Sequence, residues 1–231
     1  MQITPLSPRA ASEALDKLRR LRPLVHCLTN DVVQEITANV LLAAGASPAM
    51  VVAEEEAPYF AGIAGALLVN VGTPVPERLR SMQLSAQAAR EKHVPWVLDP
   101  VAAGVIPWRD SEIRKLIALH PTVIRGNASE ILALAGAGKG GKGVDSTDSS
   151  ASAVNAAVEL ARSTGSVVCV TGETDYATDG ERVLSVSGGN VMTTLVVGTG
   201  CSLSALTAAF CAAEKDPVTA AVSACALAKR A

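Results

Sequence analysis

The chain has 231 residues, of which 49% are hydrophobic, 18% are charged and 3% are aromatic; 20 Lys and Arg residues stand against 22 Asp and Glu, a formal net charge of −2. The apolar content excludes an intrinsically disordered chain. The balanced charge and the few aromatic residues exclude a dedicated nucleic-acid-binding protein, which needs a basic face and stacking rings. A chain of this length buries roughly 70–75% of its extended surface, enough for one substantial core.

The sequence shows no targeting or membrane-spanning segment. Its first residues lack the apolar core of a signal peptide, and most apolar tracts are shorter than the ~20 residues that span a bilayer. The tract 191–213 is long enough, but glycines, serines and threonines interrupt it, so we expect a buried strand followed by a buried helix. The five cysteines form no Cys-x-x-Cys pair, which predicts free thiols and a cytoplasmic location.

Short apolar runs alternate with amphipathic helical patterns along the chain. The runs do not alternate apolar and polar residues, so both faces of each strand must be buried, as in a parallel sheet covered by helices. Gly45 marks the end of one of the helices between them. This order predicts an α/β fold, a three-layer α/β/α sandwich with a mostly parallel central sheet and ligands at the carboxyl ends of the strands. The runs lie at 23–28, 48–52, 66–71, 95–98, 122–124 and 166–170.

Two stretches break this rhythm. Residues 136–150 are glycine-rich and predict a surface loop, with no domain boundary because the pattern resumes afterwards. Residues 173–189 contain Asp179–Gly180 between short β-like runs, which predicts an added hairpin. We therefore expect one domain over residues 1–231.

The sharpest local motif is VVGTGC, which ends at Cys201 and leads into an alanine-rich helix. Gly198 and Gly200 are expected to take positive φ, so that the N–H groups of Gly198, Thr199 and Gly200 form an anion hole at the helix start. The pKa of the Cys201 thiol is expected to fall there. A tight turn with a buried cysteine explains the same pattern.

Three further motifs place polar residues at strand ends. Asp99 follows an apolar run, although Asp-Pro also starts ordinary turns. Asn127 and Glu130 have the spacing of a capping box, so a purely structural role explains both. It does not explain Arg125, a cation at the end of an apolar strand that would suit phosphate oxygens. Thr171 begins a fourth strand-end motif, TGETD. A Cys201–His–Asp triad stays open, but none of the three histidines is placed to favour it.

Together these residues resemble the hydroxyethylthiazole kinase family of the ribokinase-like superfamily. The resemblance implies an Mg²⁺- and ATP-dependent kinase that phosphorylates the hydroxyl of 4-methyl-5-(2-hydroxyethyl)thiazole in thiamine salvage. It also implies a homotrimer with active sites between subunits. The motifs that carry it run in the family's order from about residue 20 to residue 215: PLVHCLTNDVVQ, ANVLLAAGASPAM, ALLVNVGT, PWVLDPVAAG, IRGNASEI, KGVDS, VTGETD and VVGTGC.

The resemblance also implies roles for individual residues. Arg125 and Thr171 match positions that contact ATP, and the acids near Mg²⁺ and the phosphates match Asp99 and Glu130. The predicted thiazole contacts are Asn30, Met50 and Gly198. Cys201 occupies the position where most ribokinase-like enzymes place a catalytic Asp, and we expect it to assist removal of the hydroxyl proton rather than to form a covalent intermediate.

The sequence departs from the family pattern in two places. Leu195 stands where the family often has a Lys. The sequence given ends at Ala231, before a Gly-Pro-Gly-Ser stretch that the family usually carries. Two explanations stay open: the protein has lost this C-terminal part of the family domain, or the sequence does not cover it. Two other functions stay open: another ribokinase-like enzyme, such as a pyrimidine or pyridoxal kinase or an ATP-dependent dehydratase, and a non-catalytic thiazole- or nucleotide-binding protein.

Overall fold

A single mixed sheet organises the computed structural model, which describes residues 2–136 and 150–230. The strand order is β1-β9-β8-β7-β6-β5-β4-β2-β3, and every neighbouring pair is parallel except β7–β8 and β8–β9. The strands are β1 (Ile3–Pro5), β2 (Leu24–Leu28), β3 (Ser47–Ala49), β4 (Ala66–Asn70), β5 (Trp96–Asp99), β6 (Val123–Asn127), β7 (Val167–Thr171), β8 (Thr174–Thr178) and β9 (Val183–Ser187).

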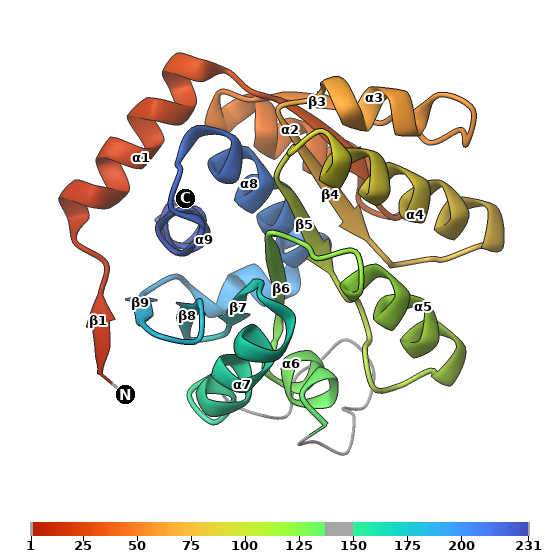
Figure 1. Cartoon of the computed structure of the whole chain (residues 1–231). Coiled ribbons are helices and arrows are strands. Elements are labelled where there is room, and N and C mark those ends of the chain that lie inside the picture. Colours follow the sequence, from red (N-terminus) through yellow and green to blue (C-terminus); the bar gives the residue numbers. More distant parts are fainter. Residues whose placement is uncertain (1, 137–149, 231) are drawn as a thin grey trace.

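Helices cover both faces of this sheet (Figure 1). One face carries α1 (Pro8–Leu21), α2 (Gln34–Ala44), α8 (Thr199–Ala213) and α9 (Pro217–Ala228). The other carries α4 (Pro76–Glu91), α5 (Pro107–Ile117), α6 (Ala128–Leu134) and α7 (Val154–Thr164), with α3 (Ala57–Ile63) packed on α4. The prediction of a three-layer α/β/α sandwich is confirmed.

The core explains why the strand sequences are continuously apolar. Successive strand residues point to opposite faces, so Leu68 packs under α8 while its neighbours Leu67 and Val69 pack under α4. Five of the six predicted apolar runs lie on strands of this kind. The run 48–52 is the exception, because it overlaps only the end of β3, a short edge strand whose residues are exposed or half-buried. β1 has no such signal because its three residues are exposed at the sheet edge.

Local signals set several element boundaries. Ser7 and Asp216 accept hydrogen bonds from the first turns of α1 and α9, and the predicted capping box of Asn127 and Glu130 starts α6. Gly45 ends α2 with φ of 103°, as predicted. The expected hairpin at Asp179–Gly180 joins β8 and β9.

Other expectations need correction or lie outside the described residues. Residues 191–197 are not a buried strand: Val191–Leu195 form a 3₁₀ helix, η1, and its apolar side chains are exposed because none of the described elements covers them. The loop expected at 136–150 falls almost entirely on residues 137–149, outside the described part. Among the described residues, no helix combines the length and apolarity needed to cross a membrane.

Candidate active site

The predicted site residues gather at one edge of the sheet. Parallel strands place their carboxyl ends together, and here β7, β6, β5, β4 and β2 lie in that spatial order. Thr171, Asp99 and Asn70 end β7, β5 and β4, and Asn30 follows β2 by two residues. The first turn of α8 approaches this row, with Cys201 Sγ 3.5 Å from Asn30 Nδ2.

Arg125 lies inside β6 with its side chain 8% exposed. Its Nη1 donates to the carbonyl oxygen of Gly200 at 3.0 Å, and its Nη2 donates to Oγ1 of Thr171. Its buried Nε has no hydrogen-bond partner among the described residues. A guanidinium charge beside a helix N-terminus suits an anionic ligand.

Asp99 is the buried acid at the centre of the row. Its Oδ2 accepts from Asn70 Nδ2 at 2.7 Å and from Ser204 Oγ at 2.8 Å. Burial raises the pKa of Asp99, while the charge of Arg125 and the hydrogen bonds from Ser204 and Asn70 act in the opposite direction.

Glu130 is the second acid, in the first turn of α6. Its carboxylate accepts backbone N–H groups from Ala102 at 2.9 Å and from Asn127 at 2.8 Å. Burial, with the neighbouring Asp99 carboxyl as the second cause, raises the pKa of Glu130 to about 7, against the lowering effect of these N–H groups and of Arg125. The capping box and the site therefore use the same side chain.

Cys201 contradicts one expectation from the sequence. Its position in the first turn of α8 predicted a lowered thiol pKa, but burial raises the pKa of Cys201 to about 11. The Asp99 carboxyl adds to this rise, whereas hydrogen bonds from Asn70 and Asn30 and the charge of Arg125 lower the pKa without outweighing burial. Desolvation and a nearby acid dominate over the helix terminus, so Cys201 is a neutral thiol at pH 7.

The start of α8 differs in detail from the predicted Gly-x-Gly turn. Gly198 has φ of 91° and caps the helix, as expected, but Gly200 is not at positive φ because it is already helical. Gly200 is needed for close approach instead, since a Cβ there would lie 3.2 Å from Arg125 Nη1. Thr199 donates through Oγ1 to backbone carbonyls of Thr193 and Val196, which fixes the entry into the helix.

Met50 lies beyond β2, at the edge strand of the sheet. It follows the edge strand β3, is partly buried, and packs against the core beneath α2 and α8. His26 lies nearby in β2 and is a core histidine: its Nε2 is 2.7 Å from the carbonyl oxygen of Val51 and its ring stacks edge-on against Phe60. The other two histidines are exposed, so no histidine of the described residues partners Cys201.

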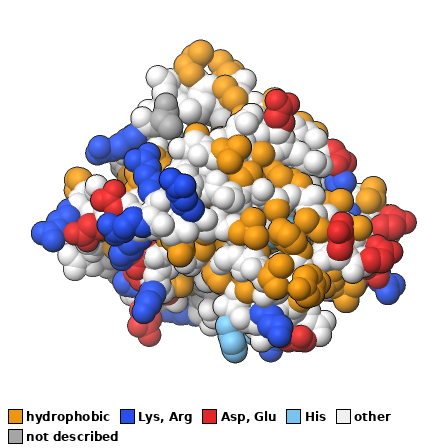
Figure 2. Space-filling view, turned by 90° about the horizontal axis from the view of Figure 1, so that it is seen from above, with side chains coloured by type: hydrophobic (Ala, Val, Ile, Leu, Met, Phe, Trp, Pro, Cys, Tyr) orange, Lys and Arg blue, Asp and Glu red, His pale blue; other side chains and the backbone are white. Residues whose placement is uncertain are grey.

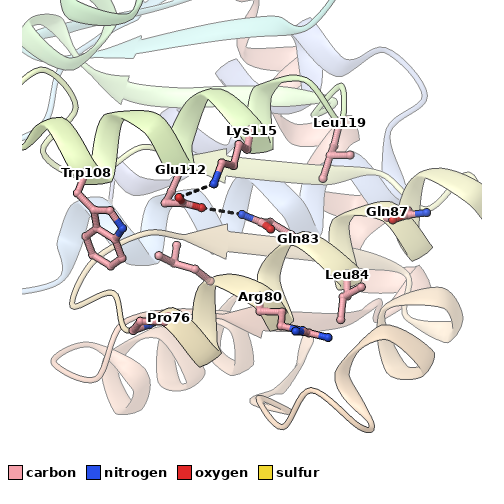
Figure 3. A pocket seen from close by; sticks show the side chains of 10 residues that line it. Pro76, Arg80, Gln83, Leu84, Gln87, Trp108, Glu112, Lys115 and Leu119 are labelled. Atoms are coloured by element: carbon pink, nitrogen blue, oxygen red, sulfur yellow. Dashed lines mark hydrogen bonds and ion pairs between the residues drawn. The ribbon is translucent and has the colours of Figure 1, made fainter.

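Of two cavities in the described residues, one borders the site. A cavity of about 920 Å³ opens beside Thr171, Thr199 and Gly200 and extends along α2, α8 and the end of α9. A second, of about 630 Å³, lies on the outer surface between α4 and α5, where Gln83 and Lys115 both contact Glu112 (Figure 3). None of the predicted site residues lines the second cavity.

Asn70 and Ser204 are the site residues that sequence reasoning missed. Both are fully buried and both donate to Asp99. The signal for Asn70 was available, because it is a polar residue at the end of the apolar run 66–71. Ser204 had no such signal in the sequence. Its neighbours in α8 are small or apolar, and which face of α8 meets Asp99 depends on tertiary packing.

Comparisons with known proteins agree with this architecture. The model of the "Hydroxyethylthiazole kinase family" matches residues 15–231. The hydroxyethylthiazole kinase of Escherichia coli O81 (strain ED1a) is 53% identical over 225 residues, covering 97% of this chain and 86% of that protein. A solved hydroxyethylthiazole kinase structure from Pyrococcus horikoshii OT3 is 38% identical with a TM-score of 0.85, covering 94% of this chain and 81% of that one.

A more distant structure extends the comparison to the fold. A ribokinase-like superfamily protein from Enterococcus faecalis V583 superposes with a TM-score of 0.66 at 12% identity, covering 99% of this chain and 86% of that one. At this identity the likeness concerns the fold, and it agrees with the mostly parallel sheet and its two helical layers. By the family match and the high identity to its relatives, this chain belongs to the hydroxyethylthiazole kinase family.

Proposed function

We propose that this chain transfers the γ-phosphoryl group of ATP to the side-chain hydroxyl of 4-methyl-5-(2-hydroxyethyl)thiazole, a step of thiamine salvage, as a single cytoplasmic transferase domain over residues 1–231. One observation carries the proposal: Arg125, Asp99, Glu130 and the first turn of α8 lie together at one edge of the sheet. The chain that holds them is about half identical to hydroxyethylthiazole kinases. Phosphoryl transfer depends mainly on positioning and charge neutralisation, which this arrangement supplies.

The phosphate end of the site lies around Arg125 and α8. Arg125 contacts phosphate oxygens through its guanidinium group, and Thr171, which accepts a hydrogen bond from it, contacts the nucleotide from the adjoining 920 Å³ cavity. The N–H groups of Thr199 and Gly200, in the first turn of α8, have no carbonyl of their own helix to pair with. They form the anion hole with Gly198 and stabilise the transferring phosphoryl group.

The residues present also fit a magnesium ion. Carboxylate oxygens are its preferred protein ligands, and Asp99 lies close enough to Glu130 to raise the pKa of the Glu130 carboxyl. The described residues contain no group of three or more His, Cys, Asp or Glu that could hold a metal, which suits an ion held largely by water and phosphate. When bound, Mg²⁺ neutralises phosphate charge; Asp99 and Glu130 are the residues that hold it.

The alcohol end of the site lies around Asn30, Gly198 and Cys201. Asn30 and Gly198 border the thiazole, and Met50 provides a soft apolar wall for its ring. The alcohol oxygen bonds to the γ-phosphorus, the bond to the β–γ bridging oxygen breaks, and ADP leaves. Cys201, a neutral thiol, assists the departure of the hydroxyl proton only weakly, which suffices because the alcohol keeps its proton until late in a loose transition state.

We further propose a homotrimer with active sites at the subunit interfaces. Residues 191–197, next to Gly198, carry five apolar side chains that are 50–77% exposed: Val191, Met192, Leu195, Val196 and Val197. Figure 2 shows apolar side chains gathered on the face of the molecule that lies at the top of Figure 1. In α2 and α3, Leu42, Tyr59 and Ile63 are exposed. Such surface favours burial against another copy. Light scattering at micromolar concentration tests it, and a monomer would contradict it.

An acceptor panel tests the reaction. The chain is incubated with Mg-ATP and hydroxyethylthiazole, hydroxymethylpyrimidine or pyridoxal, and products are identified by mass, with an EDTA-treated sample as the metal control. We expect hydroxyethylthiazole phosphate to form fastest and EDTA to abolish it. Equal turnover of the pyrimidine would indicate another ribokinase-like kinase. Thiazole binding by calorimetry without any phosphorylated product would indicate a binding protein.

A further inference from the structure

Asn70 connects the two halves of the candidate site. It ends β4 opposite Asp99 in the parallel β4–β5 register, and its side chain is fully buried. Its Nδ2 donates to Asp99 Oδ2 at 2.7 Å. Its Oδ1 accepts from Asn30 Nδ2 at 3.0 Å and from the backbone N–H of Gly72 at 3.0 Å. One amide thus links the acid of the phosphate end to the asparagine of the alcohol end.

The backbone fixes the orientation of this amide. The Gly72 N–H can only donate, so the atom facing it must be the carbonyl oxygen of Asn70, and the NH₂ group must face the carboxylate. Gly72 also confines Asn30, because a Cβ at Gly72 would lie 2.8 Å from both Cβ and Nδ2 of Asn30. Each amide has one arrangement that satisfies its partners, which makes the connection rigid.

The connection reaches the thiol. Asn30 Nδ2, the group that donates to Asn70, is also 3.5 Å from Cys201 Sγ. At the phosphate end, Asp99 Oδ2 accepts hydrogen bonds from both Asn70 Nδ2 and the Ser204 hydroxyl. A chain of contacts therefore runs from Ser204 through Asp99, Asn70 and Asn30 to Cys201, and Asn70 is its centre.

We propose that Asn70 is a positioning residue for phosphoryl transfer, which holds Asp99 at the phosphate end and Asn30 with Cys201 at the alcohol end in fixed register. The proposal rests on the proposed function for its reaction. It assigns Asn70 no contact with substrate. Misplacement of reacting groups by about 1 Å costs on the order of 100-fold in rate, which sets the scale of the expected effect.

Ser204 provides a matched control. Ser204 and Asn70 are both fully buried and both donate to the same oxygen of Asp99. Ser204→Ala removes a donor from Asp99 alone, whereas Asn70→Ala removes a donor from Asp99 and an acceptor from Asn30. If Asn70 served only to satisfy Asp99, the two variants would have the same kinetic effects.

The experiment compares kcat, both KM values and thermal unfolding in the wild-type chain and these two variants. We expect Asn70→Ala to lower kcat by about 10- to 100-fold and to raise the thiazole KM about tenfold, with the ATP KM within about twofold. We expect Ser204→Ala to lower kcat by only a few-fold and to keep the thiazole KM within about twofold. Equal effects of the two variants, or unchanged kinetics in Asn70→Ala, would overturn the proposal.

A second readout does not depend on turnover. The rate of Cys201 alkylation by iodoacetamide at fixed pH, followed by peptide mass, should change at least threefold in Asn70→Ala and remain at the wild-type rate in Ser204→Ala. A wild-type chain that phosphorylates no acceptor would overturn the proposed function, and an unchanged alkylation rate would overturn the connection through Asn70. Where Asn70→Ala does not fold, Asn70→Leu replaces it, because leucine has nearly the shape of asparagine but neither its donor nor its acceptor; the expected results and the contradicting outcomes are the same.

Discussion

Arg125 Nη1 donates to the carbonyl oxygen of Gly200 at 3.0 Å, although the two residues are 75 positions apart in the sequence. This contact attaches the first turn of α8 to β6 at the middle of the sheet. It also explains why residue 200 is a glycine, since a Cβ would lie 3.2 Å from the same guanidinium nitrogen. The cation and the helix terminus that we propose for phosphate binding are therefore held together before any ligand arrives.

Arg125→Ala should impair the use of ATP far more than the binding of thiazole. A hydrogen bond to a charged group contributes about 1.5–3 kcal/mol, which corresponds to a decrease of about 10- to 100-fold in kcat/KM for ATP. Steady-state kinetics with each substrate varied in turn, and thiazole binding by calorimetry, measure the two effects. Arg162→Ala is the matched control, because Arg162 donates to the backbone carbonyl of Gly180 away from the site. Unchanged kcat/KM for ATP in Arg125→Ala would make Arg125 a structural residue.

Cys201→Ala should reduce turnover without abolishing it. General-base assistance typically contributes about 10²–10⁴-fold, and a neutral thiol belongs at the low end, so we expect a decrease of roughly 10- to 10³-fold. Thiazole affinity should change little. Trapping of a phosphorylated Cys201 by rapid quench and mass spectrometry, or complete loss of turnover in a folded variant, would contradict this role.

The Cys201 thiol should react slowly with alkylating reagents at neutral pH. Burial raises its pKa to about 11, so its thiolate fraction at pH 7.5 is far below that of an ordinary cysteine and increases about tenfold per pH unit. Iodoacetamide labelling of Cys201, followed by peptide mass from pH 6.5 to 9.5, should show this steady rise. A plateau below pH 8 would mean that the helix terminus, rather than burial, controls the thiol.

Gly198→Ala should destabilise the fold more than Gly165→Ala. Both glycines have positive φ, but a Cβ at Gly165 meets open space, whereas one at Gly198 would lie 2.8 Å from Ile36 Cγ2 and 2.9 Å from Val33 Cγ1. We expect Gly165→Ala to lower the free energy of unfolding by about 1–2 kcal/mol for backbone strain. Gly198→Ala should add about 1–3 kcal/mol for the clash with α2. Urea unfolding curves measure both, and equal values would show that α2 moves freely aside.

Much of the architecture was predictable because local patterns are sufficient for it. Continuously apolar runs such as that of β4 predict strands buried on both faces, and Asp179–Gly180 predicts a hairpin. Asn127 and Glu130 have capping-box spacing, so the start of α6 is visible in the sequence. These features depend on residues close in the chain. The motifs also sufficed to identify the family, which the comparisons confirm.

The start of α8 shows the limit of local patterns. Val196 and Val197 have high β-propensity, yet they are exposed beside a 3₁₀ helix, because a strand needs a neighbouring strand and none is available at that position among the described residues. Gly200 resembles a turn glycine, yet it is helical, and its lack of a side chain leaves room for the guanidinium group of Arg125. Which constraint a glycine serves depends on what approaches it in space.

The sequence by itself determined the alternation of buried strands and helices, the family, and three polar residues at the ends of buried strands: Asp99, Asn127 and Thr171. Only the tertiary structure decided how those residues act on one another. It buries Cys201 beside Asp99, which raises a thiol pKa that helix position alone would lower. It also brings Asn70 between Asp99 and Asn30. Burial and contacts between distant residues arise only when the sheet closes, because they depend on which strands become neighbours rather than on which residues are adjacent in the chain.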